Sequence, residues 1–98
     1  MLQIIIQAIH NRKVLSITYG DKIRVIEPHR LGISTAGHNV LSAYQTSPST
    51  TYDLNHTNWR LFDVAKITNI NMTGAEFVAP RPLYAKSTNT MTYIYAEL

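Results

Sequence analysis

The sequence predicts a mainly β fold, a small and strongly bent antiparallel barrel of five or six strands with an N-terminal helix. Its 98 residues fit one domain. Only the first dozen residues repeat apolar side chains at a helical period, and the rest alternates in short runs separated by turn residues. We therefore expect one domain over 1–98, with a helix at 2–11, a barrel over about 14–97 and a long loop at 46–58.

The helix is predicted from apolar residues at i, i+3, i+4 and i+7, which are Leu2, Ile5, Ile6 and Ile9. The run of three isoleucines would also suit a strand, but the neighbouring glutamines and alanine favour a helix. Asn11 is expected to end it in a left-handed conformation.

Six strands follow from alternating or short apolar runs, with tight turns at 20–21 and 35–38. The expected strands are 14–19, 22–34, 39–46, 59–64, 66–73 and 90–98. The residues 74–87 hold two prolines and are expected to form an extended surface segment. In the second strand Pro28 lacks an N–H group, which favours a bulge or an edge, and Gly32 permits a second change of direction.

Composition narrows the possible functions. Charged residues make up 15% of the chain, against about 25% in typical soluble domains, and the net charge is +3. A surface with little charge favours association, and the positive balance favours anionic partners. The absence of cysteine excludes disulfides, thiol catalysis and cysteine-bound zinc. No apolar run reaches the length of a membrane span, so we expect a cytoplasmic protein without membrane contact.

The sequence contains no recognisable catalytic, metal or phosphate-loop motif. Its four histidines are not at metal-ligand spacing, and neither Gly-x-Ser-x-Gly nor a glycine-rich loop occurs. Glu27 and His29 would share a face of a regular strand, as an acid–base pair or, more commonly, as a salt-linked surface pair. We expect no enzyme, no metal and no cofactor.

Cationic and aromatic residues on separate strands could converge at one rim of the barrel. Guanidinium groups bind phosphates and aromatic rings stack on bases, which makes this set a candidate ligand site. The competing interpretation is that the aromatic residues are core and the arginines are solvated. Trp59 is expected to close the barrel as a core residue, with Arg60 on the opposite face. The candidate residues are Tyr19, Arg24, His29, Arg30, Tyr44 and Arg60.

The order of these features resembles the WYL domain over roughly residues 5–84. The matching positions are Tyr19, Arg24, Glu27-Pro28-His29, Gly37, Asn39-Val40-Leu41, Ala43-Tyr44, Arg60-x-Phe62 and Lys66-Ile67. In the triplet that gives the family its name, Asn39 and Val40 replace tryptophan and tyrosine, and only the leucine is retained.

The resemblance implies an SH3-like (Sm-like) barrel of bacterial or phage origin that senses nucleic acid or a nucleotide, in transcription or phage-defence regulation. Single-stranded DNA or RNA is then the expected ligand, with Arg24, His29 and Arg60 on phosphates and Tyr19 or Tyr44 stacking. The alternatives are a protein-interaction module acting as a homodimer or with a protein partner, and a small hydrolase centred on Glu27 and His29.

Overall fold

The computed structural model describes residues 1–48, 58–84 and 91–98, and it confirms the mainly β fold class. The elements in chain order are α1 (Leu2–His10), β1 (Lys13–Tyr19), β2 (Lys22–Ser34), β3 (Asn39–Ser47), β4 (Trp59–Asp63), the 3-10 helix η2 (Val64–Lys66), β5 (Ile67–Glu76) and β6 (Met91–Glu97). Within the described residues, no helix is long and apolar enough to cross a membrane.

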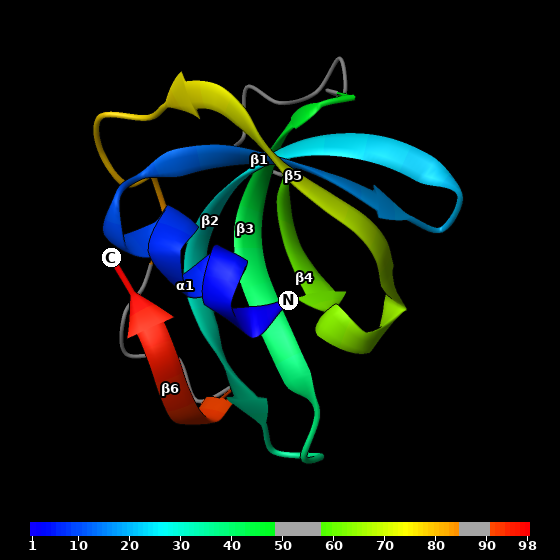
Figure 1. The fold of residues 1–98 in the computed structure, drawn as a ribbon. Helices are drawn as coiled ribbons and strands as arrows, with labels where there is room; N and C mark the ends of the chain where they lie inside the picture. Colours follow the sequence, from blue (N-terminus) through cyan, green and yellow to red (C-terminus); the bar gives the residue numbers. More distant parts are fainter. Residues whose placement is uncertain (49–57, 85–90) are drawn as a thin grey trace.

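All six strands belong to one antiparallel sheet, in the order β4-β3-β2-β1-β5. The long strand β2 bends, so that its first half pairs with β1 and its second half with β6 (Figure 1). The sheet curls into a barrel that does not close, with η2 joining its two outermost strands, β4 and β5. The amide of Asp63 in β4 donates to the hydroxyl of Tyr19 in β1 over 3.2 Å, which links β4 to the neighbour of β5.

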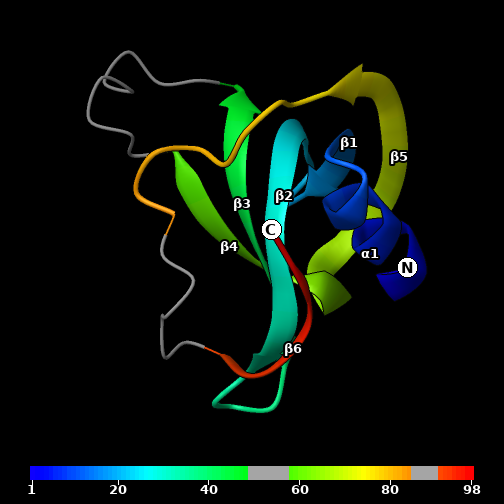
Figure 2. The same ribbon diagram turned by 90° about the vertical axis from the view of Figure 1, so that its left-hand side faces the viewer.

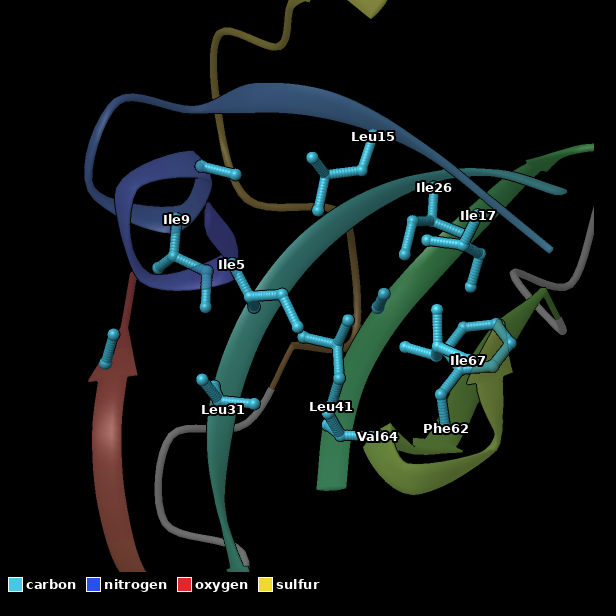
Figure 3. Packing of buried hydrophobic residues seen from close by; sticks show 13 residues of the cluster. Ile5, Ile9, Leu15, Ile17, Ile26, Leu31, Leu41, Phe62, Val64 and Ile67 are labelled. Atoms are coloured by element: carbon cyan, nitrogen blue, oxygen red, sulfur yellow. The ribbon is translucent and has the colours of Figure 1, made fainter. Parts of the chain in front are cut away.

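The core fills the space between α1 and the inner face of the curled sheet (Figure 3). Ile5, Ala8 and Ile9 form the buried face of α1, as the helical period predicts. Each fully buried aliphatic side chain contributes about 1.5–3 kcal/mol relative to exposure. Residues of all six strands and η2 complete the core: Leu15, Ile17, Ile26, Leu31, Leu41, Ala43, Phe62, Val64, Ile67 and Ala96.

The end of α1 differs from the prediction. Asn11 has a φ of −105°, and Arg12 instead takes the left-handed conformation with a φ of 52°. The peptide oxygen of Arg12 accepts from the amide of Phe77 over 3.0 Å, and its guanidinium Nη1 donates to the carbonyl of Val78 over 2.8 Å. These contacts with the chain beyond β5 favour the unusual conformation at Arg12.

The predicted bulge in β2 is present immediately after Pro28. Pro28 pairs with Ala43 and Arg30 with Ser42, which leaves His29 as the extra residue. Because one residue is inserted, His29 and Arg30 both point to the outer face of the sheet, where regular alternation would have separated them. At Gly32, an added Cβ would overlap the carbonyl oxygen of Tyr93, so only glycine lets β6 approach this closely.

Residues 77–84, the crossing segment, pass over the outer face of β2, β3 and β4, on the side of the sheet away from α1 (Figure 2). The extended surface segment predicted for 74–87 is therefore partly wrong. Residues 74–76 continue β5, and Phe77 is buried, with 7% of its surface exposed. Residues 85–87 and most of the predicted loop 46–58 lie outside the described residues.

Candidate ligand-binding site

The structure places the six predicted site residues in two groups on opposite faces of the sheet. Tyr19, Arg24 and Arg60 lie on the inner face, at the end of the barrel formed by the β1–β2 hairpin. His29, Arg30 and Tyr44 lie on the outer face, under the crossing segment. The single rim that the sequence suggested is therefore not formed.

The inner group is built around the guanidinium of Arg24, which is half-buried. Its Nε donates to the carbonyl of Tyr19 over 3.3 Å, and its Nη1 donates to Oε1 of Gln45 over 3.1 Å. The guanidinium carbon lies 5.6 Å from the ring centroid of Tyr19 and 6.0 Å from that of Phe62, within cation–π range. We call Tyr19, Arg24, Gln45 and Phe62 the hairpin-end cluster.

The positive charge in this cluster is held in place by neutral groups. Both acceptors of Arg24 are uncharged, and no carboxylate of the described residues lies within 4.0 Å of it. Arg60 lies two residues before Phe62 on the same face of β4, so it adds a second cation to this side of the sheet. A fixed guanidinium without a carboxylate partner suits an anionic ligand.

Tyr19 and Phe62 fix the position of that guanidinium. Their rings meet edge to face, with centroids 4.9 Å apart and an interplanar angle of 78°. Phe62 is a core residue, whereas Tyr19 is only partly buried against the core. The ring of Phe62 therefore belongs to the core, and the hydroxyl of Tyr19 accepts a hydrogen bond from the Asp63 amide.

The outer group is organised by His29, which is fully buried. Its Nδ1 lies 2.8 Å from the carbonyl of Glu27, and its Nε2 accepts from the amide of Arg81 over 3.0 Å. This pairing requires a neutral ring with the proton on Nδ1. Burial lowers the pKa of His29, which agrees with the neutral form. With both nitrogens bonded inside the protein, the ring is not placed to contact a phosphate.

Arg30 and Tyr44 are also covered, each with 2% of its surface exposed. Arg30 lies 3.3 Å from Oε1 of Glu97, and its guanidinium is 5.3 Å from the ring of Tyr84. The guanidinium of Arg81 lies 4.6 Å from the ring of Tyr44. Arg30 and Tyr44 therefore help to attach the crossing segment and β6 to the sheet.

Glu27 and His29 do share a face, but their side chains are not an acid–base pair. The carboxylate of Glu27 accepts two hydrogen bonds from Arg81, of 2.7 and 2.9 Å, and His29 bonds only to the backbone of Glu27. A shallow pocket of about 430 Å³ lies beside this ion pair. Its lining is mainly the chain from Glu76 to Arg81, together with Glu27. The geometry gives no support to a hydrolase at these two residues.

The prediction for Trp59 is wrong, because Trp59 packs on the outer face and Arg60 on the inner one. The indole lies 4.7 Å from the ring of His29 and stacks on Tyr84 at 5.9 Å, and its N–H donates to the carbonyl of Pro82 over 2.9 Å. Period-2 alternation requires opposite faces for neighbours but does not say which face is the core.

Comparison with known proteins identifies one family. The family model described as WYL domain matches residues 1–72. Comparisons with curated proteins and with solved structures gave no match. The matched residues run from α1 into β5 and include all of the hairpin-end cluster, whereas the crossing segment and β6 lie beyond them.

Proposed function

Because the chain belongs to the WYL domain family, we propose that it binds single-stranded nucleic acid or a nucleotide-type ligand at the hairpin-end cluster. Domains of this family are generally regulatory, bind ligands and are typically non-catalytic. Regulation of transcription or of phage defence is the setting that fits such a module.

One observation carries this proposal: the guanidinium of Arg24 lies beside the rings of Tyr19 and Phe62 and, among the described residues, is held by uncharged acceptors. An arginine already held in place loses little side-chain entropy when a phosphate binds, so more of the interaction energy contributes to affinity. Arg60 on the same side would support a second phosphate contact, and the exposed part of Tyr19 offers a surface for a base.

The outer-face residues have a different role in this proposal. His29, Arg30 and Tyr44 hold the crossing segment and do not contact the ligand. Of the six residues predicted from the sequence to bind the ligand, Arg24, Arg60 and Tyr19 keep that role. This division makes the proposal testable, because substitutions on the two faces should affect different properties.

The test is a fluorescence anisotropy titration with short single-stranded DNA and RNA at about 50 mM and about 200 mM salt. For single strands, each phosphate contact contributes about 0.7 to the slope of log affinity against log salt concentration. Arg24→Ala should weaken binding and reduce that slope by about this amount.

Lys22→Ala is the matched control, because Lys22 is an exposed cation on the same strand. It removes the same formal charge without changing the cluster. Equal effects of the two substitutions would show that only net charge matters. Absence of binding by the wild type at low salt would overturn the proposed function.

A further inference from the structure

Strand β5 forms one end of the sheet and presents a long edge without protecting charges. It pairs with β1 on one side only, and the strand order of the described residues ends there. Nine of its ten residues are exposed or half-buried, and only Ile67 is buried. In Figure 2, β5 lies at the rim of the molecule.

The sequence of this edge is unusual for an isolated strand. Edge strands are normally protected from pairing by lysine, proline or inward-pointing charges. From Ile67 to Ala75 the strand contains no charged residue and no proline. Charges occur only at its two limits, with Lys66 immediately before it and Glu76 at its end.

We propose that β5 is a dimer interface that pairs antiparallel with β5 of a second copy of this chain, about a twofold axis at Asn71. In this register Lys66 of each copy lies near Glu76 of the other, so both limits carry opposite-charge pairs. A parallel pairing in register would instead place like charges together.

The same register matches the apolar residues of the edge. Ile70 of one copy lies opposite Met72 of the other on each side of the axis, because both are one residue from Asn71. Ile70 and Met72 pair with the core residues Ile17 and Leu15 of β1, so they share the inner face. Met72 is 40% exposed, and pairing with the second copy would cover it.

The irregular parts of β5 lie outside the centre of this interface. The register between β1 and β5 is regular from Asn69 to Met72 and shifts on either side, and Gly74 has a φ of 90°. Main-chain pairing is therefore centred on residues 69–73, with the charged pairs at the two limits. The two sheets would join into one continuous sheet across the axis.

Mass measurement by light scattering over a range of protein concentrations tests the dimer. As the protein concentration rises, the measured mass of the wild type should increase from that of one chain to that of two. Asn71→Lys places two like charges opposite each other at the axis and should weaken association several-fold. Thr35→Lys adds the same charge in the exposed turn between β2 and β3 and should leave association unchanged.

A charge exchange tests the register. Lys66→Glu should weaken association, and the double variant Lys66→Glu/Glu76→Lys should restore it, because both opposite-charge pairs return. Within each copy, the double variant also replaces the pair between Lys13 and Glu76 with two neighbouring lysines, but exposed charges of this kind change stability little.

A cysteine at the axis gives an independent readout, since the chain has no cysteine of its own. Directly opposite residues of antiparallel strands have Cα atoms about 4.5–5.5 Å apart, within disulfide range. Asn71→Cys should form a covalent dimer on mild oxidation much faster than Thr35→Cys. Three results would overturn the proposal. The wild type could stay monomeric, it could form a larger ring of chains through pairing of β5 with β4, or the cysteines at positions 71 and 35 could cross-link equally fast.

Discussion

The backbone amide of Arg81 donates a hydrogen bond of 3.0 Å to Nε2 of His29. The other ring nitrogen lies 2.8 Å from the carbonyl of Glu27, so the neutral imidazole joins the crossing segment to β2. A proton on Nε2 would remove the acceptor that Arg81 uses and would place a charge in a buried position. Attachment of the crossing segment is therefore coupled to the protonation of His29.

Stability should decrease in mildly acidic solution. Burial lowers the pKa of His29 in the folded state below its usual 6.5, so the unfolded chain binds this proton more readily. Above about pH 6.5, His29 makes its full contribution to the free energy of unfolding. This contribution decreases as the pH falls below that value. Urea unfolding at several pH values measures this decrease.

Trp59, the only tryptophan, reports the same event locally because its ring lies 4.7 Å from that of His29. Its fluorescence should change over the pH range in which stability falls. His10→Gln is the control, since His10 is exposed. A pH dependence that persists in His29→Gln would contradict this account.

Removing Arg81 should destabilise the fold through Glu27. The side chain of Glu27 is 8% exposed, so its carboxylate would be left buried without its partner. Arg81→Met should therefore cost about 2–4 kcal/mol. The double variant Glu27→Gln/Arg81→Met should lose less than the sum of the single losses, as urea unfolding of all four proteins would show. Additive losses would mean that the two side chains are not coupled.

Substitution of Gly32 should separate β6 from β2. The Cβ of alanine would overlap the carbonyl of Tyr93 and lie 2.7 Å from Sδ of Met91. We expect Gly32→Ala to lower the free energy of unfolding by about 1–3 kcal/mol. In Gly37→Ala the Cβ meets no atom within 4 Å, and only the positive φ of 86° is strained, at about 1 kcal/mol. Equal melting temperatures of Gly32→Ala and Gly37→Ala would contradict the close approach of β6 to β2 at Gly32.

Much of the fold could be predicted because local patterns determine it. The helical period of the isoleucines, the alternation in 14–19 and 39–46 and the proline in β2 each predicted the observed element. The position of Pro28 even predicted the bulge. The finer assignment to an SH3-like (Sm-like) barrel stays a prediction.

The candidate site could be predicted only in part, because its geometry depends on contacts distant in sequence. The bulge turns His29 and Arg30 outward, but their burial results from residues some fifty positions later, which local alternation cannot reveal. Arg81 and Tyr84 were missed as partners for the same reason. Their only signal was the Pro-Arg-Pro-x-Tyr run of residues 80–84, in which the two prolines restrict the backbone.

Tyr19 should separate a structural role from a ligand-binding role. Tyr19→Phe keeps the ring beside Arg24 but removes the hydroxyl that accepts from the Asp63 amide. It should lose about 1 kcal/mol of stability and retain affinity for single-stranded nucleic acid. Tyr19→Ala should lose affinity as well, which the anisotropy titration would detect. If Tyr19→Phe binds as weakly as Tyr19→Ala, the hydroxyl of Tyr19, and not its ring, contacts the ligand.

The central claim is that Arg24 in the hairpin-end cluster contacts the anionic groups of a ligand. Its most direct test is NMR of the arginine side-chain Nε–H signals during titration with a short single-stranded oligonucleotide. We expect the signals of Arg24 and Arg60 to shift with a common affinity, while that of Arg81, which is bonded to Glu27 on the opposite face, stays in place. Shifts of Arg81 without any change at Arg24 would contradict the account.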